Sequence, residues 1–237
     1  MESVISAHAS GLETMSLAVK YHQWIYDVVR PYMGARVLEI GGGLGNFSHL
    51  LQHHERLVML DNDPVCIRHL HDRFDGQANV MILEADILDE AQLEQLSNER
   101  LDSAVCINVL EHITDDRDAL RNIYRVLQPG AHFALLVPAL PALYGSLDAT
   151  LGHVRRYTRR EASEKVAGAG FTVLRARYFN SVGVAGWYML GRLRRQQEHG
   201  AGQVRFYDRY VVPILSRVEH VIPPPFGQSV VVIGRKE

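Results

Sequence analysis

The chain has 237 residues, of which 47% are hydrophobic and 22% charged, and these proportions are typical of a globular enzyme with one sizeable core. A formal net charge of −2 excludes a general electrostatic attraction to nucleic acid or to an anionic membrane. The N-terminus lacks a basic segment followed by an apolar run, and no stretch approaches the ~20 apolar residues of a membrane span, so we expect a cytoplasmic protein.

The predicted elements alternate between helices and strands. Apolar residues recur at helical spacing from Leu17 to Val29, which predicts a first helix that ends near Pro31. Strands are predicted over residues 35–40, 56–61, 79–86, 101–107, 131–139, 171–179 and 229–234, and helices over 46–52, 63–74, 89–101, 115–127 and 158–170. Apolar strands that alternate with helices predict a doubly wound α/β fold with a mostly parallel seven-stranded sheet.

The last third of the chain departs from this alternation. Residues 180–228 form a segment far longer than a hairpin turn, with an apolar part, a basic part, a helical part and a proline cluster. Such an insert in a compact domain is usually functional or mobile. We expect a single domain over 1–237 that consists of a helical cap (1–33), a ligand-binding core (34–178), a helical insert that covers the site as a lid (179–228) and a last strand (229–237).

A glycine-rich turn joins the first strand to the next helix, in the sequence Glu39-Ile-Gly41-Gly-Gly43-Leu-Gly45. Glycines allow positive φ angles and a close approach of the backbone to a ligand, and the N–H groups of the following helix point to the same place. The dinucleotide fingerprint G-x-G-x-x-G requires a third glycine where this chain has Asn46, so that pattern fails. Taken alone, the turn also fits a tight connection in any α/β protein.

Polar residues follow three further strands, at the edge where an open parallel sheet binds its ligands. Asp61 ends the second strand about 20 residues past Gly41, the distance at which an acid can accept hydrogen bonds from both hydroxyls of a ribose. Asp63 fits the N-cap of a helix that begins with proline. Asp86 closes the third strand, and Asn108 follows the fourth. Each acid singly also fits a capping or surface role, but the ordered set favours one nucleoside-type ligand.

These motifs resemble those of the class I S-adenosylmethionine-dependent methyltransferases over roughly residues 34–178. The resemblance implies S-adenosyl-L-methionine as the cofactor. It places Glu39, Gly41, Gly43 and Gly45 beneath the methionine part, Asp61 and Asn62 at the ribose, Asp86 and Ile87 at the adenine, and Asn108 beside the reacting methyl group. A narrower similarity, in residues 144–161, 179–195 and 223–236, is to bacterial methyltransferases associated with glycosyl- or lipid-modifying systems.

Two histidines are candidates for the general base that an alcohol or phenol acceptor would need. His112 follows the fourth strand and has an ordinary pKa near the working pH, but it fits equally a residue that fixes the loop or contacts the cofactor. His153 lies in the loop after the fifth strand. Quinone-pathway O-methyltransferases carry E-x-x-E-H at the first position and can bind a divalent metal through it. Asn108 replaces the first glutamate here, so no metal is expected.

The loop after the fifth strand also carries residues that could bind an acceptor. Its candidates are Tyr144, Arg155, Arg156 and Tyr157, and Asp148 lies in the same loop. Arginines suit bidentate binding of an anionic group. Thr158 is instead expected to cap the next helix, with Glu161 completing a capping box.

The insert and the N-terminal helix are expected to close the site from two sides. By family analogy, the N-terminal helix covers the cofactor with Tyr21, His22 and Trp24. In the insert, apolar Trp187, Tyr188 and Met189 precede Arg192, Arg194 and Arg195. This segment could be an amphipathic face for a lipid-like substrate or a membrane surface, or a core helix with a solvated basic end.

Taken together, the sequence predicts methyl transfer from S-adenosylmethionine to a small molecule by in-line displacement, with oxygen favoured and nitrogen or carbon open. The acceptor is expected to be anionic or lipid-like, and peripheral contact with a membrane stays open. The alternatives are a nicotinamide-dependent oxidoreductase, which the glycine pattern disfavours, and a non-catalytic S-adenosylmethionine-binding module. No nucleic-acid substrate is expected, because no Asn/Asp-Pro-Pro-aromatic motif follows the fourth strand and no long basic face is visible. The oligomeric state is not predicted.

Overall fold

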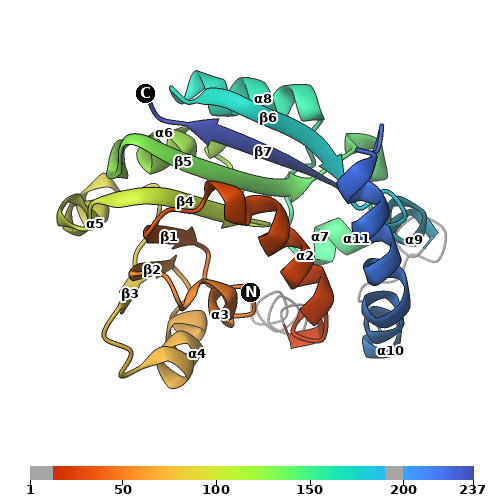
Figure 1. The fold of residues 1–237 in the computed structure, drawn as a ribbon, viewed down its shortest axis with the longest axis horizontal. Helices are drawn as coiled ribbons and strands as arrows, with labels where there is room; N and C mark the ends of the chain where they lie inside the picture. Colours follow the sequence, from red (N-terminus) through yellow and green to blue (C-terminus); the bar gives the residue numbers. More distant parts are fainter. Residues whose placement is uncertain (1–12, 190–199) are drawn as a thin grey trace.

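The computed structural model describes residues 13–189 and 200–237, which form a seven-stranded sheet between two layers of helices (Figure 1). The strands lie in the order β3-β2-β1-β4-β5-β7-β6. Their bounds are β1 (Arg36–Ile40), β2 (Arg56–Asp61), β3 (Val80–Glu84), β4 (Leu101–Ile107), β5 (Leu127–Pro138), β6 (Thr172–Phe179) and β7 (Ser229–Arg235). Strands β1 to β5 pair in parallel, whereas β7 runs antiparallel to both β5 and β6. The predicted doubly wound, mostly parallel seven-stranded sheet is confirmed.

The helices connect these strands and cover both faces of the sheet. The α-helices are α2 (Val19–Val29), α3 (Ser48–Leu51), α4 (Pro64–Phe74), α5 (Glu90–Leu93), α6 (Asp116–Val126), α7 (Ser146–Thr150), α8 (Arg159–Gly168), α9 (Gly183–Trp187), α10 (Ala201–Phe206) and α11 (Val212–Val221). Short 3-10 helices are η1 (Arg30–Tyr32), η2 (Glu94–Asn98), η3 (Leu110–His112) and η4 (Pro141–Leu143), and η6 (Tyr207–Val211) is a π-helical turn. The helix predicted over 89–101 divides into α5 and η2 and ends at Asn98, where the poor helix formers Ser97 and Asn98 stand.

Alternate residues of the strands point to opposite helical layers, as the two-residue period of a strand requires. Leu38 and Val58 pack with residues of α5, α6 and α8, whereas Val37 and Leu57 pack with residues of α2, α3, α4 and α11. All four side chains are fully buried. The sheet is therefore covered on both faces, which explains why its strands read as continuous apolar runs.

Two of the predicted helix caps are present. The carboxylate of Asp63 accepts the N–H of Val65 at 2.8 Å, at the start of α4. The hydroxyl of Thr158 accepts the N–H of Glu161 at 3.0 Å, at the start of α8. Each cap satisfies a backbone donor that the helix itself leaves without an acceptor.

The insert ends in a continuous helical rod made of α10, η6 and α11. Pro213 lacks the N–H that a regular helix needs, and the π-turn directly before it shifts the hydrogen-bond pattern so that the rod continues. Val212 and Leu215 bury the inner face of the rod in the same core as α2. Figure 1 shows α2 and the rod at the same side of the molecule. The predicted basic residues Arg192, Arg194 and Arg195 lie outside the described residues. No described helix has both the length and the hydropathy needed to cross a bilayer.

Candidate active site

A cavity of about 1050 Å³ lies beyond the carboxyl ends of β1, β2, β3 and β4 and extends towards the insert. Eight of the nine predicted cofactor residues line it, namely Glu39, Gly41, Gly43, Asp61, Asn62, Asp86, Ile87 and Asn108. The two predicted catalytic histidines, His112 and His153, and two predicted acceptor residues, Arg156 and Trp187, line it as well. The structure thus brings residues from separate strand ends and from the long loops into one cavity, while their individual roles stay predictions.

The glycine turn after β1 has left-handed backbone at the three predicted glycines, with φ angles of 76° at Gly41, 53° at Gly43 and 75° at Gly45. A Cβ atom at Gly41 would lie 2.3 Å from Cγ2 of Val109, so a larger residue would have to displace the loop after β4. Gly45 does not line the cavity; a Cβ there would lie 2.7 Å from the ring of Phe74. Its absent side chain therefore serves helix packing.

Asp61 organises this turn. One of its carboxylate oxygens accepts the N–H of Gly43 at 2.8 Å, and the other accepts the N–H of Asp63 at 2.9 Å. Burial raises the pKa of Asp61, and these two hydrogen bonds oppose the rise. Each carboxylate oxygen can accept a second hydrogen bond, so the side chain keeps acceptor capacity for the hydroxyl groups of a ligand in the cavity.

Glu39 lies next to Asp61 at the base of the turn and is 3% exposed. Its Oε2 atom is buried and accepts no hydrogen bond from any residue that the structure describes. Burial raises the pKa of Glu39 to about 8, and the charge of Asp61 adds to the rise. A buried carboxylate oxygen without a hydrogen-bond donor is costly unless a cation pairs with it. Glu39 and Asp61 therefore fit a cationic ligand. S-adenosylmethionine, the cofactor that the resemblance implies, carries a positive charge on its sulfonium.

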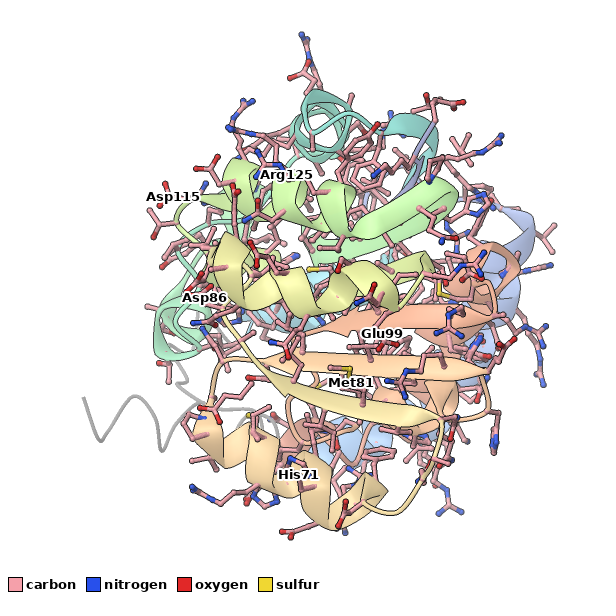
Figure 2. The ribbon with its side chains drawn as sticks, turned by 90° about the vertical axis from the view of Figure 1, so that its left-hand side faces the viewer. His71, Met81, Asp86, Glu99, Asp115 and Arg125 are labelled. Carbon is pink, nitrogen blue, oxygen red and sulfur yellow. The ribbon has the colours of Figure 1, made fainter. Side chains whose placement is uncertain are left out.

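Asp86 is held at the cavity by hydrogen bonds within its own turn. Its carboxylate accepts the N–H of Leu88 at 2.9 Å, and its own N–H donates to the side chain of Gln92 at 2.8 Å. Figure 2 shows Asp86 at the same edge of the molecule as Asp115, which follows the loop after β4. Asn108, where β4 ends, adopts a left-handed φ of 54° that turns the chain over the cavity.

Asp148, on α7, is the centre of a buried hydrogen-bond network on the acceptor side. Its Oδ1 atom accepts from Nδ1 of His153 at 2.9 Å and from Nε of Arg156 at 2.7 Å. Its Oδ2 atom accepts from the N–H of Gly145 at 3.0 Å and from Nε1 of Trp187 at 3.1 Å. Burial opposes the charge of Asp148, but the hydrogen bonds from His153 and Arg156 outweigh it and hold the pKa below its ordinary value. The network fixes the orientation of His153 at the cavity wall.

Arg156 and Trp187 stack in the same wall. The guanidinium carbon of Arg156 lies 4.5 Å from the centre of the Trp187 ring, a favourable cation–π contact. Nη1 of Arg156 donates to the carbonyl of Ala139 at 2.9 Å, whereas Nη2 is buried and finds no acceptor among the described residues. Trp187 is buried and belongs to a small core with Leu143. The core interpretation therefore fits Trp187, whereas Tyr188 and Met189 are each 47% exposed. The free donor of Arg156 suits an anionic group in the cavity.

Glu111, beside His112, is a second buried carboxylate and is fully inaccessible to solvent. Neither of its oxygens accepts a hydrogen bond from the described part of the chain, and Oε1 lies 3.9 Å from Nε2 of His153. Burial raises the pKa of Glu111 to about 7, although the charges of His153 and Arg156 lower it. Glu111, His112 and His153 offer ligand atoms within 4.8 Å of one another, so they form a group that could hold a metal ion.

The other three predicted acceptor residues lie outside the cavity. Tyr157 is fully buried in the core, and its hydroxyl donates to Asp116 at 2.9 Å. Arg155 turns away from the cavity and donates to the same carboxylate at 2.9 Å. The hydroxyl of Tyr144 donates to the carbonyl of His153 at 2.8 Å, so it supports the loop from outside. Side chains along this irregular loop point in different directions without a regular period. For this reason the sequence did not show that Arg156 faces the cavity and that the other three do not.

The far end of the cavity is formed by α2 and the insert. Tyr21 and His22 line it, as predicted for the N-terminal helix, whereas the ring of Trp24 packs at a tilt against that of Phe179 instead, with ring centres 4.0 Å apart. Burial lowers the pKa of His22 to about 4. Asn180, at the end of β6, also lines this end and adopts a left-handed φ of 64°. The sequence did not single out Asn180, because no spacing rule marks an asparagine after a strand.

The sequence pattern of a methyltransferase domain matches residues 26–176, more than half of the chain. This chain belongs to the class I S-adenosylmethionine-dependent methyltransferases. S-adenosylmethionine, the predicted cofactor, is confirmed at the level of the family. The two acids at the glycine turn, Glu39 and Asp61, suit the positive charge of this cofactor.

Curated relatives match part of the sequence of this chain. It is 28% identical over 167 residues to a probable S-adenosylmethionine-dependent methyltransferase of Mycolicibacterium smegmatis, a match that covers 69% of this chain and 62% of the relative. It is 29% identical over 110 residues to the ubiquinone biosynthesis O-methyltransferase of Pseudomonas fluorescens, covering 45% of each. A shorter match, 43% identical over 53 residues, is to a probable ribosomal RNA small subunit methyltransferase A of Methanosarcina barkeri and covers 22% of this chain and 18% of that protein. The matched segments thus span less than two thirds of each relative.

Among solved structures, this methyltransferase is similar to an S-adenosylmethionine-dependent methyltransferase of Thermotoga maritima, described as a possible histamine N-methyltransferase. The TM-score is 0.65, the sequences are 16% identical, and the match covers 100% of both chains. At this identity the likeness establishes the fold alone.

Proposed function

We propose that this protein transfers the methyl group of S-adenosylmethionine to an oxygen atom of a small acceptor that carries an anionic group. The bound cofactor would supply an electrophilic methyl group on a sulfonium; the acceptor oxygen bonds to that methyl carbon in line with the S–C bond, which breaks and releases S-adenosylhomocysteine. The chain's own task is to hold the acceptor oxygen in that line, which contributes about 7–11 kcal/mol, and to remove its proton. The acids of the glycine turn, Glu39 and Asp61, hold the cationic cofactor.

The observation that carries the proposal is the hydrogen bond between Asp148 and Nδ1 of His153, at 2.9 Å, in the wall of the cofactor cavity. Because the carboxylate accepts from Nδ1, the neutral ring carries its proton there and leaves the lone pair of Nε2 available. Nε2 takes the proton of the acceptor hydroxyl as the new C–O bond forms, and Asp148 stabilises the imidazolium that results. His112, whose ring centre lies 4.9 Å from that of His153, shapes the same region.

Arg156 and Trp187 are the proposed acceptor-binding residues. The unpartnered Nη2 of Arg156 donates to an anionic group of the acceptor, and the apolar residues around Trp187 contact its hydrocarbon part. The partial match to an O-methyltransferase of quinone biosynthesis supports a small acceptor with a hydroxyl group. The short match to a ribosomal RNA methyltransferase makes RNA the second substrate class to test.

The experiment measures formation of S-adenosylhomocysteine with hydroxybenzoates, uncharged phenols, amines and ribosomal RNA as acceptors. We expect turnover with an anionic phenol and a fall of about 100-fold or more in kcat for His153→Gln, the lower range for loss of a general base. Cofactor affinity, measured by calorimetry, stays unchanged in this variant. His69→Gln, on the exposed side of α4, is the matched control.

Four outcomes would contradict the proposal. Full activity in His153→Gln together with a loss in His112→Gln would transfer the role of the base to His112. Turnover of amines but not of phenols, insensitive to His153→Gln, would replace oxygen by nitrogen as the accepting atom. Cofactor binding without turnover of any acceptor would favour a non-catalytic binding module, and binding of a nicotinamide cofactor in its place would favour an oxidoreductase.

A further inference from the structure

The rod formed by α10, η6 and α11 presents a continuous apolar stripe to solvent. Four of its members are spaced four residues apart along the rod and are 51% to 65% exposed, namely Phe206, Tyr210, Ile214 and Val218. Ile222, which is 67% exposed, follows directly after α11 in extended backbone. On a regular helix a four-residue spacing drifts by about 40° at each step. The π-turn η6 adds a residue within the stripe and offsets part of this drift. The stripe is therefore a feature of the rod as a whole and not of a single turn.

This stripe is separate from the face by which the rod packs on the protein. Val212 and Leu215 are buried against α2 and fill the inner face. A helix at the surface of a soluble protein normally has one apolar face, and that face is directed to the core. A second, exposed apolar face of this length indicates a surface that binds a partner.

The charges of the rod are sorted between its inner and outer sides. Its two acids are turned inward as hydrogen-bond acceptors. Asp208 accepts the N–H of Tyr21 at 2.8 Å, and Glu219 accepts the N–H groups of Asn180 at 3.0 Å and Ser181 at 2.7 Å. Both acids are buried.

The charged residues that stay exposed on the rod are Arg205, Arg209 and Arg217. Each of them directly precedes a residue of the stripe, so the three arginines lie along one edge of it. The outer side of the rod therefore combines an apolar stripe with a purely cationic edge, although the net charge of the chain is −2.

The same rod also forms part of the cavity wall. Val204, Phe206 and Tyr207 line the cavity, and Phe206 also begins the stripe. The stripe therefore begins at a residue of the cavity wall.

We propose that the rod docks this protein on the surface of an anionic lipid bilayer, with the stripe among the headgroups and the arginines against lipid phosphates. No described helix can cross a membrane, so the contact is interfacial. A second copy of this chain is the competing occupant of the stripe. It would place two sets of arginines along one seam without an exposed acid on either rod to pair with them. The lipid surface is the occupant that matches both the apolar and the charged part.

The test is flotation of the purified protein with vesicles of phosphatidylcholine alone or mixed with phosphatidylglycerol, in the absence of cofactor and acceptor. We expect binding to the mixed vesicles, weakened at least tenfold in the variant with Ile214→Ser and Val218→Ser. Leu174→Ser, at an exposed apolar residue of β6, is the control and should bind as the wild type does. Both positions of the double variant are exposed, so its circular dichroism should be unchanged.

The cationic edge is tested separately by replacing Arg205, Arg209 and Arg217 with glutamine. Each arginine should contribute about fivefold to the affinity for anionic vesicles, and high salt should remove this contribution. A variant with Arg68, Arg121 and Arg160 replaced by glutamine changes the net charge equally on other exposed surfaces.

The proposal is overturned if neither vesicle binds the wild type, or if the serine double variant binds as well as the wild type. A dimer in lipid-free solution that Ile214→Ser and Val218→Ser dissociate would assign the stripe to a second copy instead. Because binding is measured without turnover, a failure here leaves the proposed methyl transfer untouched, and an inactive enzyme that still binds vesicles leaves the docking surface intact.

Discussion

Asp148 is the residue whose replacement should have the widest effect, because all four of its partners donate to it. Gly145, His153, Arg156 and Trp187 converge on its two oxygens at 2.7 to 3.1 Å. Asparagine at this position has the same size but replaces one oxygen with an NH₂ donor. In either orientation of the amide, two buried donors lose their acceptor, and Arg156 loses its counter-charge. We therefore expect Asp148→Asn to destabilise the fold rather than to be tolerated as a conservative change.

The magnitude follows from this count. Two buried donors left without an acceptor cost about 1–3 kcal/mol each, and removal of one partner from a buried ion pair costs about 3–5 kcal/mol. The two estimates describe the same loss, so we expect a decrease of about 3–5 kcal/mol in the free energy of unfolding. A domain of this kind has about 5–15 kcal/mol in total, so the variant should still fold, with a clearly lower denaturation midpoint.

The assay is urea denaturation at neutral pH, with Asp118→Asn as the matched control. Asp118 pairs with Arg121 at 2.8 Å on the surface, where both side chains are half exposed, and such a pair contributes about 0–1 kcal/mol. Equal midpoints for the two variants would refute the assignment of Asp148 as the centre of the network. The pH dependence gives a second check. Because the folded pKa of Asp148 is lowered, its contribution is present above the unfolded value and is lost as the pH falls through the folded value. The difference between wild type and Asp148→Asn should therefore shrink in acid.

Three further predictions concern the cofactor side and the metal question. The pKa of Glu39 is raised from 4.5 to about 8 in the folded protein, so the cofactor-free protein should lose stability as the pH rises between these values. Glu39→Gln should remove this fall of stability with pH, measured by thermal denaturation at a series of pH values. The same fall in the variant would contradict the assignment. Asp61→Ala should weaken S-adenosylmethionine binding by about 1–3 kcal/mol in calorimetry, because buried hydrogen bonds are lost, and an unchanged affinity would remove Asp61 from the site. Chelation with EDTA should leave turnover intact, because the guanidinium of Arg156 already places positive charge beside Glu111. A loss that magnesium restores would show that the group around Glu111 binds a metal.

The local patterns of the sequence were sufficient for the fold and for the cofactor side of the cavity. A few neighbouring residues are enough to specify an apolar strand, the glycine turn or the cap at Asp63. The open parallel sheet then brings the ends of its strands to one edge. For that reason Glu39, Asp61 and Asp86 could be predicted to share a cavity without knowledge of the tertiary structure.

The tertiary structure alone decided the acceptor side. In the loop after β5, Arg155 and Tyr157 turn to Asp116, which lies on another helix, while Arg156 between them turns into the cavity. An irregular loop has no period from which such directions can be read. The exposed stripe of the rod could not be predicted from the sequence either. The sequence shows which residues of a helix are apolar, but not which of them a neighbouring helix such as α2 will cover. These features depend on contacts between residues far apart in the chain, and only the folded structure specifies those contacts.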